Sequence, residues 1–204
     1  MVLDKLRPYL KDFFENVAKV FATLGLTPNF LSVISLILAF VAGISFYYSR
    51  SDIDLLLVAV SLVILSGFLD AVDGALARYT GKAGPKGDFL DHVIDRYADV
   101  FLICGVFFGG YGSWEVGVVA ITGILICSYL GTQAQAVNIG RYYGGIMGRA
   151  DRLVLLVLFT MMNYAAPQEI YGMQLLGWLI VVFAITSHIS AIQRFAHIWK
   201  ELSS

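Results

Sequence analysis

The stretch SGFLDAVDGALARYTGKAGPKGDFLDHVIDRYADV, residues 66–100, decides the fold because it places a dense group of acids between two long apolar runs. It holds six of the 15 acidic residues in a chain of 204 residues. These six are Asp70, Asp73, Asp88, Asp91, Asp95 and Asp99. A chain that elsewhere avoids charge needs a physical reason to keep so many carboxylates in one place.

Composition indicates a membrane protein. The chain is 58% hydrophobic and 14% charged, with a mean hydropathy of +0.76, whereas about a quarter of the residues in a soluble domain are charged. We therefore expect an all-α integral membrane protein that forms a single domain over residues 1–204, with no nucleic-acid partner. Cys104 and Cys127 lie inside apolar runs and are expected to be core thiols, not a disulfide.

Six segments are long enough to cross a hydrocarbon core of ~30 Å at ~1.5 Å per residue. They form a bundle over 28–196 and cover about residues 29–48, 54–79, 88–110, 114–137, 150–165 and 170–195. Thr27 and Pro28 suit the cap and the first turn of the first segment. The preceding residues, 1–26, alternate apolar and charged positions at helical spacing. They predict an amphipathic helix on the membrane surface, with a helix packed against the bundle as the alternative.

The basic residues set the orientation. Of 14 Lys and Arg residues, four lie in the N-terminal segment, and three lie in the loop after the second span taken with the end of that span. Three more lie in the loop before the fifth span taken with the start of that span, and two lie at the C-terminal end of the chain. The loops on the opposite side carry only Arg50. The positive-inside rule therefore predicts a multi-pass protein of the cell membrane with both termini in the cytoplasm.

In this topology the acids fall at one depth. Asp70 and Asp73 lie near the cytosolic end of the second predicted span, and Asp91 and Asp95 lie near the same end of the third. Residues three or four apart share a helix face, so each pair forms one acidic face. Because the two helices are joined by a short loop, the two acidic faces can meet.

Such a meeting requires a counter-charge. An acid within a span costs about 2.5–3.5 kcal/mol, and like charges add repulsion. Bound divalent ions offset this cost, and oxygen ligands without nearby Cys or paired His favour Mg²⁺, Mn²⁺ or Ca²⁺ over zinc. Two ions suit four carboxylates better than one, and two ions can stabilise the attacking and leaving oxygens of phosphoryl transfer. The acids thus predict a phosphate-bearing substrate at the cytosolic surface.

The neighbouring polar residues have less specific interpretations. His92 is expected to pack beside the site without binding metal. Asp88 is expected to cap the start of the third span. Asp99 either extends the acidic face or pairs with Arg96.

Residues 70–95 resemble the signature of the CDP-alcohol phosphotransferases, D-x2-D-G-x2-A-R-x8-G-x3-D-x3-D. Every specified position is filled, by Asp70, Asp73, Gly74, Ala77, Arg78, Gly87, Asp91 and Asp95. The resemblance implies an enzyme of lipid synthesis that moves a substituted phosphate group from a CDP-linked lipid to a small polar alcohol and releases CMP. It also implies two metal ions, usually Mg²⁺ with Mn²⁺ as an alternative, and a homodimer.

The resemblance also implies roles for individual residues. Asp70, Asp73 and Asp91 would ligate metal, and Asp95 would ligate the second ion and act as the base for the acceptor hydroxyl. The CMP moiety would be lined by residues from three segments: Asn29, Ser32, Gly74, Ala77, Arg78, Gly84, Lys86 and Gly87.

Three arginines are candidates for the acceptor site. Arg149, Arg152 and Arg194 would lie at the cytosolic ends of the last two spans and could bind a phosphate, although topology alone also favours arginine on that side. The segments around them resemble phosphatidylinositol-phosphate synthases and their archaeal relatives, which favours inositol phosphate as the acceptor. The sequence departs from these relatives after Tyr129, where a basic residue is often found. Glycerol phosphate as acceptor and CDP-inositol as donor therefore stay open.

A different class of protein also fits acids in facing spans, namely a transporter of divalent cations or protons. Transport sites tend to lie near the bilayer midplane in broken helices. Here the acids crowd one interface, so the sequence favours the transferase.

Overall fold

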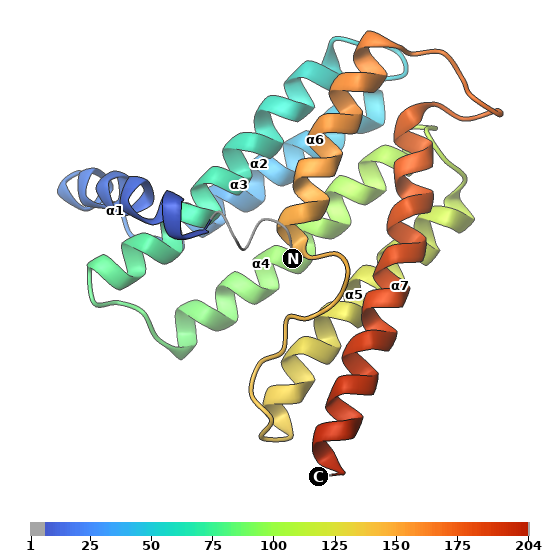
Figure 1. Cartoon of the computed structure of the whole chain (residues 1–204). Coiled ribbons are helices and arrows are strands. Elements are labelled where there is room, and N and C mark those ends of the chain that lie inside the picture. Colours follow the sequence, from blue (N-terminus) through green and yellow to red (C-terminus); the bar gives the residue numbers. More distant parts are fainter. Residues whose placement is uncertain (1–6, 204) are drawn as a thin grey trace. The chain divides into compact units, whose positions relative to one another are not determined.

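The computed structural model describes residues 7–203, with side chains from residue 11 onward, and this part of the chain is all-α (Figure 1). Seven helices account for most of it, and its sole β feature is an isolated bridge between Ile170 and Met173. The helices are α1 (Arg7–Thr23), α2 (Pro28–Tyr48), α3 (Leu55–Tyr79), α4 (Pro85–Phe108), α5 (Trp114–Ala136), α6 (Arg149–Ala165) and α7 (Leu175–Leu202). The all-α prediction is confirmed, and α2 to α7 follow the six predicted segments in order.

Four helices are long and apolar enough to cross a membrane, namely α2, α3, α5 and α7. This is typical of a multi-pass membrane protein. The other two predicted spans differ for identifiable reasons. Helix α6 has only 17 residues, and α4 carries the acids of the signature in its first half.

Contacts between Cα atoms divide the chain into two compact units, Val2–Gly105 and Val106–Ser204. The first unit contains α1 to α3 and most of α4. The second unit contains the end of α4 and helices α5 to α7.

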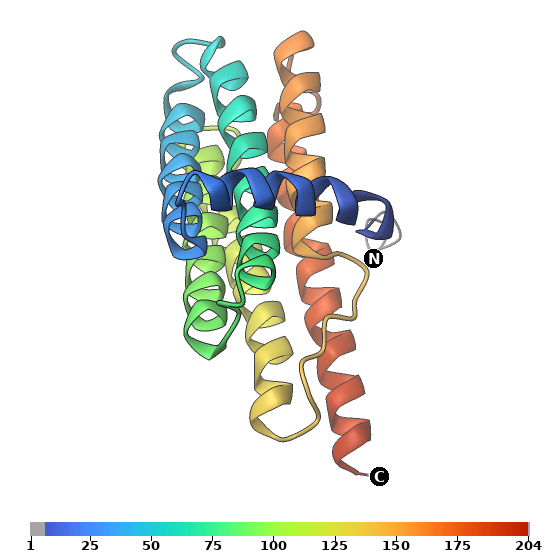
Figure 2. The ribbon, with the colours of Figure 1, turned by 90° about the vertical axis from the view of Figure 1, so that its left-hand side faces the viewer.

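In the first unit, α2 and α3 lie side by side and α1 runs across them (Figure 2). The buried core beneath α1 contains Ala18 of α1, Leu31 of α2, and Leu69, Val72, Ala75 and Leu76 of α3. Phe14, Val17 and Phe21 on the same face of α1 are partly buried against this core. The N-terminal helix therefore packs on its own unit, as the alternative interpretation expects, and its place on a membrane surface stays a prediction.

Helix α4 approaches α2 closely through two glycines. A Cβ atom built on Gly43 would lie 2.5 Å from the carbonyl oxygen of Phe101, and one built on Gly105 would overlap the backbone of Gly43. The absence of side chains at both positions brings the two backbones into contact.

In the second unit, α5 and α7 lie side by side and α6 packs against α7 (Figure 1). The start of α7 is held by the fully buried Asn163 of α6, whose side chain accepts a hydrogen bond from the Leu176 amide at 3.1 Å and donates one to Gln174 at 3.0 Å. The α6 and α7 helices are thus joined at this end by satisfied buried polar groups.

Helix boundaries agree with the sequence at most ends. Thr27 caps α2 by accepting a hydrogen bond from the Phe30 amide at 3.3 Å, as expected. The last helix begins at Leu175 and not at residue 170, because Tyr171 and Gly172 have φ angles of 51° and 79°, which a helix cannot continue. The proposed cap at Asp88 is wrong, because α4 begins three residues earlier, at Pro85.

Candidate active site

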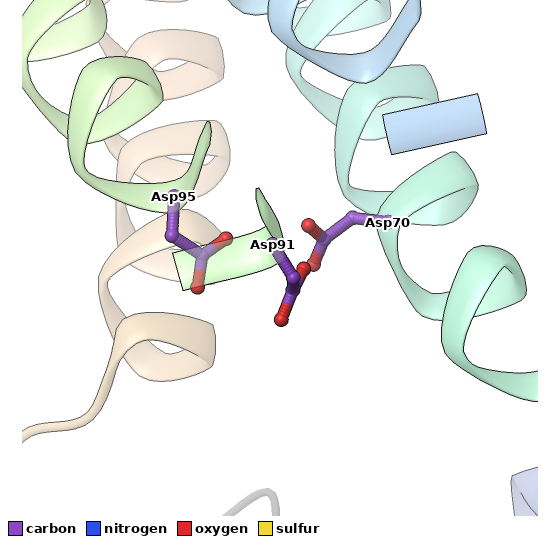
Figure 3. Close-up of side chains that lie close together, drawn as sticks. All are labelled: Asp70, Asp91 and Asp95. Carbon is purple, nitrogen blue, oxygen red and sulfur yellow. The ribbon is translucent and has the colours of Figure 1, made fainter. Parts of the chain in front are cut away.

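Three of the four signature carboxylates meet between α3 and α4. One oxygen from each of Asp70, Asp91 and Asp95 lies within 4.8 Å of the other two. The close-up shows these side chains directed toward a common space, Asp70 from α3 and the other two from α4 (Figure 3). All three are half-buried. The prediction that the acidic faces of these two helices meet is therefore confirmed for these three residues.

This arrangement is electrostatically unfavourable by itself. Two unit charges 4.8 Å apart repel by about 3.5 kcal/mol at an effective dielectric constant of about 20. A cation between them would convert this repulsion into attraction. Three oxygen donors and no sulfur suit Mg²⁺ or Mn²⁺, which prefer carboxylates. The donor set therefore fits the divalent metal that the sequence predicts.

The fourth acid, Asp73, is oriented by a serine of α2. Its side chain is buried, and Oδ2 accepts a hydrogen bond of 2.5 Å from Ser32 Oγ. Ser32 Oγ also lies 3.1 Å from the carbonyl oxygen of Pro28. Asp73 is thus not among the three acids that meet, but it remains close enough to Asp70 and Asp91 to be repelled by their charges. Its role as a metal ligand stays a prediction.

Arg96 lies between two acids of its own helix. Its guanidinium is 3.5 Å from Asp95 and 3.5 Å from Asp99, which is buried. The pairing interpretation of Asp99 is therefore the one that the structure supports. Arg96 offsets part of the negative charge beside the three-acid site and limits the positions that the Asp95 carboxylate can take.

His92 lies beside the site, as expected. Its Nδ1 atom is 3.0 Å from the carbonyl oxygen of Asp88 and 3.9 Å from a carboxylate oxygen of Asp91. A contact with the preceding turn of the helix explains its position without a metal.

The residues predicted to line the nucleotide fall into two groups. Ser32 is buried and donates a hydrogen bond to Asp73, and its contact with the nucleotide stays a prediction. The others lie at the ends of α2 and α3 and at the start of α4, where most are exposed: Asn29, Gly74, Ala77, Arg78, Gly84, Lys86 and Gly87. A Cβ on Gly87 would lie 3.9 Å from the Asn29 side chain, so the starts of α2 and α4 lie close together.

The three predicted acceptor residues are in the second unit and differ in environment. Arg149 and Arg152 lie in the first turn of α6, and Arg152 is buried. Arg194 of α7 is also buried, and it donates hydrogen bonds to the backbone carbonyls of Cys127, Tyr143 and Gly144 at 2.7, 3.2 and 2.8 Å. Their role in acceptor binding stays a prediction.

Sequence reasoning missed the contacts that fix these side chains. The hydrogen bond from Ser32 to Asp73 was not predicted. The α7 side chains that contact the loop before α6, Ser190 and Gln193, were not singled out. Their spacing with Arg194 on one helix face was the available signal, but it does not reveal which backbone they touch.

Comparison with known proteins places the chain among lipid-synthesis transferases. The CDP-alcohol phosphatidyltransferase family profile matches residues 25–195. The archaetidylinositol phosphate synthase of Pyrococcus horikoshii is 33% identical over 181 residues, which cover 89% of this chain and 93% of the relative. This agrees with the resemblance carried by the signature.

Solved structures with the same fold come from the phosphatidylinositol phosphate synthase of Mycobacterium tuberculosis. Its complex with manganese and citrate has a TM-score of 0.76 at 20% identity, covering 91% of this chain and 88% of that chain. A second structure of that enzyme, with CDP-DAG bound, has a TM-score of 0.75 at 21% identity, covering 91% and 93%. At this level of identity the likeness is one of fold.

Proposed function

Because the chain belongs to the CDP-alcohol phosphatidyltransferase family, we propose that it transfers the substituted phosphate group of a CDP-linked lipid to inositol phosphate. The observation that carries this proposal is the meeting of Asp70, Asp91 and Asp95 within 4.8 Å at the family signature. The names of the relatives, both synthases of inositol phosphate lipids, support the acceptor. The CDP-DAG bound to one of them supports the donor.

The metal site is proposed to consist of four acids, Asp70, Asp73, Asp91 and Asp95, with two Mg²⁺ or Mn²⁺ ions. Manganese in the mycobacterial enzyme supports a divalent ion here. When bound, the ions would neutralise the carboxylates and the charge of the diphosphate. Ser32 keeps Asp73 oriented for this purpose through its hydrogen bond.

The chain's own residues accept a proton from the acceptor and orient the carboxylate that accepts it. Asp95 accepts the proton of the acceptor hydroxyl. The hydroxyl oxygen forms a bond to the lipid-linked phosphorus, the bond between that phosphorus and the diphosphate bridging oxygen breaks, and CMP leaves with the electron pair. Arg96, at 3.5 Å, orients the Asp95 carboxylate.

We further propose a nucleotide site in the first unit and an acceptor site in the second unit. Asn29, Arg78 and Lys86 are exposed at helix ends and can reach the phosphates and ribose of CMP. Arg149, Arg152 and Arg194 are proposed to bind the phosphate of the acceptor.

In the membrane we propose six spans, with α4 and α6 joining the four apolar helices, α1 on the cytosolic surface, and a homodimer as the assembly. The distribution of Lys and Arg supports a cytosolic active site and cytosolic termini. Cysteine labelling of intact cells tests this topology, since a cysteine placed at Arg50 should react from outside and one placed at Lys82 should not.

The test of function uses the purified full chain with CDP-diacylglycerol or its isoprenoid ether counterpart. Inositol phosphate, inositol, glycerol phosphate and serine are supplied in turn, and CMP release and lipid products are measured by mass spectrometry. We expect the inositol phosphate lipid to form, and Asp95→Asn to abolish it. Formation of a glycerol phosphate lipid alone would replace the proposed acceptor, and no CMP release with any acceptor would refute the activity.

A further inference from the structure

One acid of α4 is buried although it lies outside the three-acid site. Asp99 is 6% exposed and is not one of the three carboxylates that meet within 4.8 Å. A buried carboxylate is costly unless a cation or hydrogen bonds compensate for its lost hydration. Arg96 supplies such a cation, since its terminal nitrogen Nη2 lies 3.5 Å from Asp99 Oδ2. The burial of Asp99 is thus linked to the position of this arginine.

The same nitrogen of Arg96 also faces an acid of the site. Nη2 lies 3.5 Å from Asp95 Oδ2, so the two acids share one nitrogen at equal distances. A charge-assisted hydrogen bond between a guanidinium and a carboxylate is usually about 2.7–2.9 Å long. Arg96 is therefore attracted by both acids and makes a short bond to neither. All three residues lie within about one turn of α4, which brings their side chains together.

Little else holds the guanidinium in this position. Among the described residues, the Arg96 side chain makes no hydrogen bond or ion pair other than those with Asp95 and Asp99. Its Nε atom is buried and has no hydrogen-bond partner in this part of the chain. The position of Nη2 therefore depends on the balance between two attractions. Neutralising Asp99 would remove one of them and let Arg96 close on Asp95.

A closed pair between Arg96 and Asp95 would compete with metal binding. Asp95 is one of the three acids whose oxygens meet, and its side chain is only 16% exposed. The guanidinium and a divalent ion are both cations that seek the same carboxylate. Residues that contact a metal ligand commonly change metal affinity by about 10–100-fold. The distance between Arg96 and Asp95 should therefore control how well Asp95 serves as a ligand.

We propose that Asp99 is a positioning residue that holds Arg96 back from Asp95 and so keeps the Asp95 carboxylate open to a divalent ion. Asp99 acts through Arg96 and touches neither metal nor substrate. The inference rests on the proposed function for the metal site alone, and it needs no particular donor or acceptor.

The test is a double-mutant cycle read by Mn²⁺ binding to the purified full chain in calorimetry. Asp99→Asn should weaken Mn²⁺ binding by about tenfold or more. Arg96→Gln should bind Mn²⁺ at least as tightly as wild type, because the competing cation is gone. The double variant should match Arg96→Gln within about twofold, since no arginine is left to be released. Asp88→Asn, which neutralises an exposed acid of the same helix, should stay close to wild type.

Activity gives a second readout, one that a merely structural role would not reproduce. In Asp99→Asn, the Mn²⁺ concentration for half-maximal CMP release should rise by about tenfold or more. The kcat in saturating Mn²⁺ should stay within about twofold of wild type. The released arginine gives up Asp95 at high metal concentration, whereas a misfolded site does not recover. A kcat that stays low at every metal concentration would overturn the inference.

Two results of the binding cycle would also overturn it. Wild-type Mn²⁺ affinity in Asp99→Asn would show that this acid does not hold the arginine back. An equal loss of affinity from Asp99→Asn in the wild-type and Arg96→Gln backgrounds would trace the effect to charge alone. If Arg96→Gln does not melt cooperatively, Arg96→Met, which has a side chain of similar length, takes its place in the cycle.

Failure of the proposed function would be recognised separately. If the wild-type protein releases no CMP with any acceptor, the proposed activity is refuted, while the Mn²⁺ binding cycle still decides the role of Asp99.

Discussion

Replacing Asp91 by asparagine should change the stability of the protein in opposite directions with and without metal. Asp91 shares a space with Asp70 and Asp95, with oxygens within 4.8 Å of one another. At that distance each pair of charges repels by about 0.9 kcal/mol at the dielectric constant of water and about 3.5 kcal/mol at an effective value near 20. The variant removes two such pairs from the metal-free protein.

The Asp91 side chain is 39% exposed, which favours the lower end of this range. A relief of about 2 kcal/mol would raise the Tm by roughly 4–8 °C in a chain of this size. In saturating metal we expect the wild-type protein to be more stable than the variant. An ion present at about 100 times its Kd stabilises the wild-type protein by ~2.7 kcal/mol, which the variant loses with its ligand.

The assay is thermal unfolding of the purified protein in EDTA and in excess Mg²⁺ or Mn²⁺. Wild type should gain Tm on adding metal, and Asp91→Asn should start higher and gain little. Asp88→Asn is the matched control, because Asp88 is on the same helix but outside the three-acid group. A variant that melts below wild type in EDTA, or that keeps the full metal-induced gain, would refute the electrostatic reasoning.

Three further changes test other parts of the structure. Ser32→Ala removes the hydrogen bond to Asp73 and should weaken Mn²⁺ binding by about tenfold in calorimetry. Ser32→Thr keeps a hydroxyl and should retain the wild-type affinity. Equal Mn²⁺ affinity in wild type and both variants would show that this hydrogen bond does not support metal binding. Gly105→Ala places a Cβ against the backbone of Gly43 and should cost about 3 kcal/mol or more; a Tm equal to that of wild type would show that α2 and α4 do not touch there. Arg152→Ala should raise the apparent KM for inositol phosphate far more than that for CDP-lipid, and an equal rise for both would count against the acceptor site.

The helices were predictable because each carries its own signal. Apolar length located α2 to α7 to within a few residues at most ends, and Thr27 with Pro28 marked the start of α2. The same rule applied to Pro85 would have found the start of α4, where Asp88 was taken as the cap instead. The signature located the acids, since spacing along two neighbouring helices is enough to place them on facing surfaces.

What the sequence could not supply are contacts between segments distant in the chain. Ser32 and Asp73 are 41 residues apart, and Arg194 reaches Cys127 across 67. Nothing in their local pattern says which backbone or carboxylate they will meet. The sequence places Arg194 at a helix end but does not show the three backbone carbonyls that it meets, because these contacts arise only when α5 and the following loop pack against α7.

The most direct test of the central claim is CMP release from CDP-lipid by the purified chain before and after the removal of divalent metal. If ions held by the carboxylates of α3 and α4 enable the transfer, release should stop in chelator and return when Mg²⁺ or Mn²⁺ is restored. Full turnover by metal-free protein would contradict the account.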